Sequence, residues 1–236
     1  MSKTDSKRII EPIAKIYTDF PEKFGIPRQS GRVDTLMGRI VFEPKYRIAE
    51  AVKGLSEFSH IWLIFDFSEA HRDTWSPTVR PPRLGGNKRI GVFASRSPFR
   101  PNSIGLSSVK LLNIEISAEE GPILYVAGAD ILNKTPIYDI KPYIAYSDSH
   151  NDALSSYSDV HRDDKLYVVW SEGIYESIPK STADTIERCI ADDPRPSYHS
   201  DKRKYGMRFS CYNVNFYVKD HTATIISIEK SKNNDR

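Results

Sequence analysis

The feature that most restricts the fold of this chain is a proline-rich stretch at residues 95–107, which lies between apolar runs at residues 89–94 and 108–112. Proline fixes the backbone angle φ and donates no hydrogen bond to a neighbouring strand, so neither Pro98 nor Pro101 fits a central strand. The pattern therefore predicts a stiff loop that joins two β-strands.

The same loop carries the polar groups Arg96, Arg100, Asn102 and Ser103. Rigid loops on a scaffold of strands are common places for binding groups, because the scaffold fixes where the side chains lie. A solvated connection without a ligand is the alternative. The density of arginine and proline by itself leaves these two interpretations about equal.

The spacing of apolar residues predicts a mainly β fold for the first 150 residues. Strands are expected at residues 13–20, 38–43, 59–67, 89–94, 107–116 and 122–127. The aromatic and β-branched run at 59–67 is typical of a strand buried on both faces. The spacing at 46–58 predicts one short helix. Many strands, few helices and frequent glycine and proline turns favour a small β-barrel or a sandwich over residues 1–150.

The remainder, residues 151–236, is expected to form a small α+β domain after a polar linker at 146–164. A strand is predicted at 165–170, a helix at 181–191, and a hairpin from alternating segments at 207–218 and 222–228. A chain of 236 residues, of which 39% are hydrophobic and 28% charged, is long enough for one medium and one small domain.

Composition also bears on location and on metals. No run of about 18 apolar residues is present, so no membrane span is expected. Cys189 and Cys211 lack metal-binding spacing, so no metal is expected, and so few cysteines favour a reducing compartment. The polar N-terminus lacks the apolar stretch of a signal peptide. We therefore expect a cytoplasmic protein.

Two further loops, at residues 23–32 and 128–143, also combine polar side chains with glycine or proline. Taken alone, the loop at 23–32 is better explained as a surface turn, and a turn rich in Asx residues and proline is the alternative for 128–143. Three such loops on an apolar barrel indicate a pocket for a small molecule. The chain has no glycine-rich dinucleotide motif and no Walker-type phosphate loop, which disfavours a Rossmann methyltransferase or dehydrogenase.

Basic residues are clustered although the net charge is only +3. The first cluster comprises Arg80, Arg83, Lys88, Arg89, Arg96 and Arg100, and the second comprises Lys202, Arg203, Lys204 and Arg208. Basic groups among aromatic residues suit a surface that follows phosphates. For either cluster alone, an ordinary solvated face is the better explanation.

Five motifs in a fixed order give the chain a resemblance to a known family. They are residues 24–29 (FGIPRQ), 58–62 (FSHIW), 96–107 (RSPFRPNSIGLS), 130–143 (DILNKTPIYDIKPY) and 193–198 (DPRPSY). Together they resemble the TsaA-like family. One departure is that Asn133-Lys134 stands where the family usually has Asp-Gly or Asn-Gly, so the turn there must form in another way.

The resemblance implies a β-barrel methyltransferase that uses S-adenosylmethionine without a Rossmann fold and acts as a homodimer. Its implied substrate is threonylcarbamoyl-adenosine at position 37 of tRNA, next to the anticodon, which the methyltransferase modifies at N6. Carried over by motif, the implied cofactor contacts are Pro27, Arg28, Gln29, His60, Ile61, Arg96, Leu106, Asp130, Ile131, Leu132 and Asn133.

Roles in catalysis are hypotheses within that resemblance. Asp139, Asn102 and Ser103 are the candidates to orient N6 or to accept its proton, and Asp139 ranks first because an ionised carboxylate only accepts hydrogen bonds. A structural role for Asp139, before Lys141, is at least as consistent with the sequence. Arg100 suits a bidentate pair with the threonyl carboxylate of the substrate.

The C-terminal domain is expected to grip the anticodon arm of tRNA. The candidate contacts are Arg195, Tyr198, Lys202 and Arg203. Deletion of residues 151–236 should then weaken tRNA binding more than cofactor binding. A module that senses S-adenosylmethionine or binds RNA without catalysis is the main alternative. A hydrolase that uses Asp139 and His60 is a third class, for which no nucleophile is evident.

Overall fold

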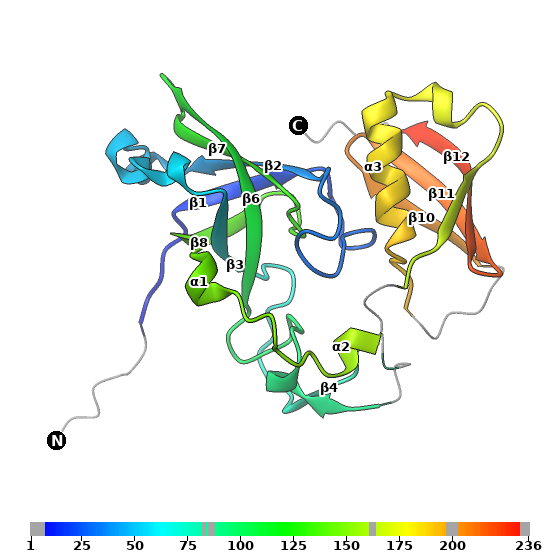
Figure 1. Ribbon diagram of the computed structural model, residues 1–236, viewed down its shortest axis with the longest axis horizontal. Coiled ribbons are helices and arrows are strands. Elements are labelled where there is room, and N and C mark those ends of the chain that lie inside the picture. The colour runs from blue at the N-terminus through cyan, green and yellow to red at the C-terminus, as the bar shows by residue number, and fades with distance from the viewer. Residues whose placement is uncertain (1–7, 82–83, 85–87, 161–163, 197–202, 232–236) are drawn as a thin grey trace.

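The computed structural model describes residues 8–81, 84, 88–160, 164–196 and 203–231, and places them in two neighbouring β-rich domains (Figure 1). The N-terminal domain is a closed barrel of six antiparallel strands in the order β1-β2-β7-β6-β3-β8. Its strands are β1 (Ala14–Thr18), β2 (Met37–Phe42), β3 (His60–Asp66), β6 (Ile104–Ser117), β7 (Gly121–Ala127) and β8 (Thr135–Pro142). The predicted mainly β fold with a small barrel is confirmed.

Alternating side chains fill the barrel. Along β3, Ile61 and Leu63 are fully buried, and Trp62 between them faces outward. The outer face is only partly covered: Trp62 remains partly exposed, although its indole Nε1 donates a 2.9 Å hydrogen bond to Asp148 in helix α1 (Ala145–Asp148). The prediction that this strand is buried on both faces is therefore wrong for its outer face.

The segment predicted as one helix at residues 46–58 forms short 3₁₀ turns instead. The turns are Pro44–Tyr46, Ala49–Val52 and Leu55–Glu57. Gly54 adopts a φ of 82°, a left-handed conformation that interrupts any right-handed helix at this point. Within these turns only Val52 is buried, so the apolar spacing does not provide a continuous face for packing.

The segment predicted as a loop at residues 128–143 is a loop only in its first half, because the second half is β8. This strand pairs with β1 on one side and with β3 on the other, and so closes the barrel. Pro136 is tolerated because the pairing with β3 begins one residue later, at Ile137 opposite Phe65. On the other side Pro136 lies opposite Lys15 of β1, so only the edge toward β3 lacks a paired residue there.

The strand predicted at residues 89–94 is also shorter than expected. Only β5 (Ile90–Gly91) is extended, and it pairs with β4 (Thr78–Val79) in a separate two-stranded ribbon. A 3₁₀ turn, Val92–Ala94, follows β5 and leads into the proline-rich loop.

The C-terminal domain is a four-stranded sheet, in the order β10-β11-β12-β9, with helix α3 packed on it (Figure 1). The elements are β9 (Tyr167–Trp170), a 3₁₀ turn (Tyr175–Ser177), α3 (Lys180–Ala191), β10 (Lys204–Phe209), β11 (Tyr212–Lys219) and β12 (Thr222–Lys230). The segment predicted as one strand at 207–218 is divided between β10 and β11, because Ser210 turns the chain with a φ of 51°. The linker contains α1 and the short helix α2 (Tyr157–Val160).

The two domains share one element, the long connection between β1 and β2. Phe20, Val33 and Leu36 of this connection are buried in the hydrophobic core of the C-terminal domain. The backbone N–H of Ser210 donates a 2.6 Å hydrogen bond to the carbonyl oxygen of Asp19, which extends the contact to the sheet. A loop of the barrel is therefore built into the core of its neighbour.

Across the described ranges, no helix has the length and apolar character needed to cross a membrane. The same ranges contain no group of three or more histidine, cysteine, aspartate or glutamate side chains placed to hold a metal ion.

Candidate functional site

Three loops meet at one end of the barrel: residues 23–32, 95–103 and 128–134. The backbone N–H of Gly31 donates a 2.9 Å hydrogen bond to the carbonyl oxygen of Gly128, which joins the first loop to the third. Gly128 has a φ of +77°, and a Cβ on it would lie 3.2 Å from backbone atoms of Gly31. This close approach requires glycine, since a side chain would push the loops apart.

Polar side chains complete the junction. The guanidinium of Arg96 donates a hydrogen bond to the side-chain oxygen of Gln29, which links the second loop to the first. The hydroxyl of Ser107 on β6 donates a 2.6 Å hydrogen bond to the Asp130 carboxylate in the third loop. Residues predicted separately from three distant segments are therefore brought together.

The pKa of the Asp130 carboxyl is raised above its ordinary value. Burial is the main cause, because it disfavours the charged form of the carboxyl. The hydrogen bond from Ser107 and the positive charge of Arg96 act in the opposite direction and offset part of the effect. Burial therefore favours the neutral form of the Asp130 carboxyl, while Ser107 and Arg96 favour its charged form.

An open cavity of about 1800 Å³ extends from this junction along the barrel end. Its wall includes six of the residues predicted from the sequence: Arg28, Gln29, Arg96, Arg100, Asn102 and Ser103. Among the described residues of the wall, eight are arginines and three are aspartates. The cavity is therefore cationic and suits an anionic ligand.

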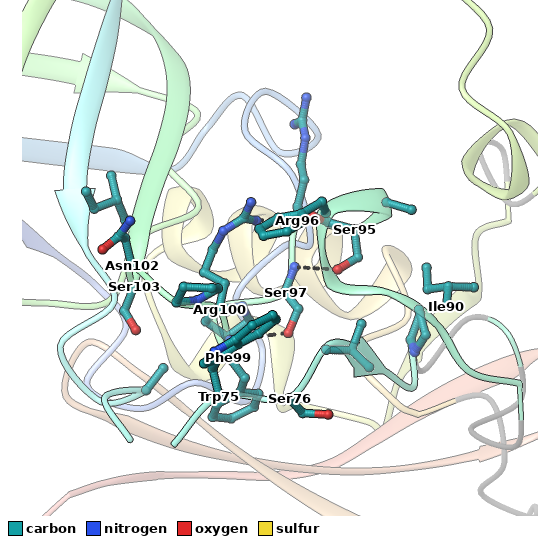
Figure 2. A pocket seen from close by; sticks show the side chains of 18 of the residues that line it. Trp75, Ser76, Ile90, Ser95, Arg96, Ser97, Phe99, Arg100, Asn102 and Ser103 are labelled. Carbon is teal, nitrogen blue, oxygen red and sulfur yellow. Dashed lines mark hydrogen bonds between the residues drawn. The ribbon is translucent and has the colours of Figure 1, made fainter. Parts of the chain in front are cut away.

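The proline-rich loop forms a stiff part of this wall (Figure 2). The backbone N–H groups of Ser97 and Phe99 each bond to the hydroxyl of the serine two residues earlier, at 3.3 Å. Arg100 donates a 3.2 Å hydrogen bond to the carbonyl oxygen of Ser95. At the end of the loop, Ser103 accepts a 2.8 Å backbone bond from Phe67. Local hydrogen bonds thus add to the restriction that the prolines impose.

Other residues predicted as cofactor contacts lie close to the junction and also have contacts within the fold. Pro27 and Ile131 are buried, and Leu132 is partly buried. Asn133 accepts a 3.1 Å hydrogen bond from the backbone N–H of Thr18. Lys134 takes a φ of 64°, so lysine itself adopts the left-handed conformation for which the family usually has glycine.

Four predicted residues are not brought into this group. His60 begins β3, while the cavity lies at the Asp66 end of that strand, and Ile61 is buried in the barrel core. Leu106 is 55% exposed on β6. Asp139 forms a 2.8 Å ion pair with Lys141 and is outside the cavity wall.

The predicted tRNA contacts in the C-terminal domain have different surroundings. Arg195 is mostly buried, its guanidinium is paired with Asp193 at 2.8 Å, and its carbonyl oxygen accepts a 2.6 Å hydrogen bond from Arg28. Arg203 is exposed and its guanidinium lies 5.8 Å from the ring centre of Tyr205. The other two predicted contacts, Tyr198 and Lys202, lie outside the described residues.

A polar cluster in the cavity wall was not predicted from the sequence. His71 Nε2 lies 2.9 Å from both carboxylate oxygens of Asp66, a residue that is only 9% exposed. Burial of Tyr138, together with the negative charge of Asp66 and a hydrogen bond to it, raises the pKa of the Tyr138 phenol. A carboxylate inside the apolar run of β3 was the signal that could have revealed this cluster.

Comparison with known proteins covers both domains. The family model of the tRNA-methyltransferase O N-terminal domain matches residues 15–149, and that of the TrmO C-terminal domain matches residues 163–231. The chain is 36% identical over 229 residues to the tRNA (adenine(37)-N6)-methyltransferase of Escherichia coli K12, which covers 93% of this chain and 97% of the relative. It is 43% identical over 173 residues to the protein of that name from Eikenella corrodens, covering 72% and 97% respectively.

Solved structures agree with these matches. A crystal structure of TrmO from Pseudomonas aeruginosa superposes with a TM-score of 0.80 at 31% sequence identity, covering 98% of this chain and 100% of the other. The resemblance on which the sequence analysis relied is thus confirmed over both domains. The chain belongs to the tRNA-methyltransferase O family.

Proposed function

We propose that this protein transfers a methyl group from S-adenosylmethionine to N6 of adenine 37 in tRNA, and that the preferred substrate carries threonylcarbamoyl on that nitrogen. The named relatives support the reaction class, since several are tRNA (adenine(37)-N6)-methyltransferases and others are named for S-adenosylmethionine. The single observation that carries the proposal is the convergence of Gln29, Arg96 and Asp130 beside a cationic cavity.

The donor set at the junction fits S-adenosylmethionine. A guanidinium such as that of Arg96 suits the carboxylate of the methionine part, and a carboxylate such as Asp130 suits a ribose hydroxyl or an amine. No side chain stands at the contact between Gly31 and Gly128, where the two backbones approach each other closely. The cofactor supplies a methyl group already activated on a sulfonium.

The protein's own task is then to position the nucleophile and to exclude water. We assign the orientation of N6 to Asn102 and Ser103 before Asp139, because both belong to the cavity wall. The oxygens of Asp139 are already engaged by Lys141 and by the backbone N–H of Ile140. Acylation of N6 makes its proton more acidic, so a strong base is not required.

Arg100 is proposed to hold the threonyl carboxylate. One of its nitrogens is fixed by the carbonyl oxygen of Ser95, and guanidinium has further N–H donors for a second partner. The C-terminal domain, with Arg203 at its surface, is proposed to contact the anticodon arm. Action as a homodimer, which the family resemblance implies, is part of the same proposal.

The test is transfer of labelled methyl from S-adenosylmethionine to tRNA that carries threonylcarbamoyl-adenosine, compared with the same tRNA without that group. Label in the modified tRNA alone is the expected result. Equal label in both would keep the methyltransferase and remove the role of Arg100. If no label is transferred although the cofactor still binds, the proposed methyltransferase activity is contradicted, and a module that senses the cofactor is favoured.

A further inference from the structure

Two large aromatic side chains stand exposed in the wall of the cavity, and the proposed chemistry does not use them. Trp75 is 53% exposed and Phe93 is 74% exposed, although both belong to the wall. Their ring centres are 6.3 Å apart, and the planes of their rings meet at 33°. An exposed pair of this size leaves apolar area in water that a flat partner could cover.

The backbone holds this pair in place. Trp75 comes just before β4 and Phe93 just after β5, so pairing of these two strands brings the two rings together. The backbone N–H of Val92 donates a 2.9 Å hydrogen bond to the carbonyl oxygen of Pro77, and the Val92 side chain is 1% exposed. The two-stranded ribbon therefore presents the rings to the cavity from a fixed base.

The charges around the pair indicate the kind of partner. Arg72 places its guanidinium 3.8 Å from the ring centre of Phe99, in the wall that Figure 2 shows with Trp75 and Arg100. Arg89, on the ribbon, is exposed and donates a 2.8 Å hydrogen bond to Thr78. Exposed rings among arginines are the combination by which proteins bind unpaired nucleotides, whose bases stack while their phosphates pair with cations.

We infer that Trp75 and Phe93 form a stacking platform for an unpaired base of the tRNA anticodon loop, beside the nucleotide that is methylated. The inference rests on the proposed function for the identity of the RNA. Arginines outnumber aspartates in the wall, which favours a polyanion over a second copy of this chain, since each copy carries a net charge of +3. The ribbon thus selects single-stranded RNA and contributes to the affinity for the anticodon loop.

The first test uses the full chain and an anticodon stem-loop RNA that carries threonylcarbamoyl-adenosine. Trp75→Ala and Phe93→Ala should each weaken RNA binding about 5- to 100-fold, the range found when one stacked aromatic is removed. KM for tRNA should rise, while kcat at saturating tRNA and the affinity for S-adenosylmethionine stay near wild type. Trp75→Phe should retain most of the binding, because a smaller ring still stacks.

Matched controls separate stacking from general effects. Tyr146→Ala removes an aromatic side chain that is 93% exposed but lies outside the cavity wall, and it should leave RNA affinity unchanged. A stem-loop with an abasic nucleotide next to position 37 supplies the second half of a double-mutant cycle. The losses of RNA affinity caused by the abasic nucleotide and by Trp75→Ala should not add, because both changes remove the same contact.

Three results would overturn the platform. Wild-type RNA affinity and KM in both alanine variants would show that no base stacks there. Equal loss of affinity for S-adenosylmethionine would assign the rings to the cofactor, and a change in molar mass by light scattering would assign them to a second copy of the chain. If the wild type methylates no tRNA, the proposed function fails, but the stem-loop binding assay still decides whether the platform binds RNA.

Discussion

Arginine side chains have different surroundings at the barrel end and at the contact between the two domains. In the barrel, Arg96 and Arg100 line the open cavity that we propose as the ligand site. At the contact with the C-terminal domain, Arg188 of α3 is paired with Asp34, and Arg32, which also belongs to the cavity wall, is paired with Asp192. We therefore propose that the barrel end carries out the methyl transfer, and that the C-terminal domain holds part of that end in position.

The connection between β1 and β2 takes part both in the C-terminal core and in the junction of loops. It contributes Phe20 and Leu36 to the C-terminal core, and it carries Gln29 into the junction of loops. Deletion of residues 151–236 would uncover these apolar side chains. We therefore now expect the deletion to weaken cofactor binding together with tRNA binding, in contrast to the expectation from the sequence.

The largest predicted effect concerns the shared core. Phe20 is fully buried and meets Phe209 edge-on, with ring centres 5.4 Å apart, so Phe20→Ala should destabilise the protein by about 3–5 kcal/mol. Hydrogen exchange should rise in β10 and β11 as well as in the loop at 23–32. Leu63→Ala, in the barrel core alone, is the matched control and should raise exchange mainly in the barrel. Unchanged exchange in β10 for Phe20→Ala would refute the shared core.

A smaller effect distinguishes arginines that face the cavity from those that are paired. Arg96→Ala should lower kcat/KM for tRNA methylation about 100-fold, because the loops that position the reactants lose a link. Arg96→Lys should restore only part of the wild-type kcat/KM, since lysine lacks the planar guanidinium group that forms paired hydrogen bonds. Arg188→Ala, which removes a paired arginine on α3, should change kcat/KM little. Equal losses of kcat/KM in Arg96→Ala and Arg188→Ala would contradict the distinction between cavity-facing and ion-paired arginines.

The smallest predicted effect is on the pH dependence of stability. Because burial raises the pKa of Asp130, the folded protein holds that proton more tightly than the unfolded chain does. This group's contribution to stability therefore falls as pH rises from the unfolded value, near 4, through the folded value. Asp130→Asn should remove this part of the slope in chemical denaturation across that range and retain an acceptor for Ser107. Parallel curves for wild type and variant would contradict the assignment.

Many strands could be predicted from the sequence, because the alternation of apolar and polar residues and the positions of turn residues are local properties of the chain. The strands near residues 38–43 and 122–127 and the helix at 181–191 lie where expected. The errors arose where distant packing decides, as in β8, whose prolines suggested a loop. Pairing of that strand with β1 and β3 cannot be read from its own residues.

The candidate site was predictable only in part for the same reason. Motifs identified the loops that carry Gln29, Arg96 and Asp130, and the structure brings these loops together. The motif at 58–62 also suggested His60, but alternation along β3 does not tell which end of the strand faces the cavity. Asp66 at the other end lines the cavity instead.

The most direct test of the account is a crystal structure of the full chain with S-adenosylhomocysteine, the product of methyl transfer. We predict that this ligand lies in the junction of loops, with Gln29 and Arg96 in contact with it and residues 130–133 beside it. A ligand bound between the strands of the C-terminal sheet, or at the His60 end of β3, would contradict the central claim that the barrel loops form the methyl-transfer site.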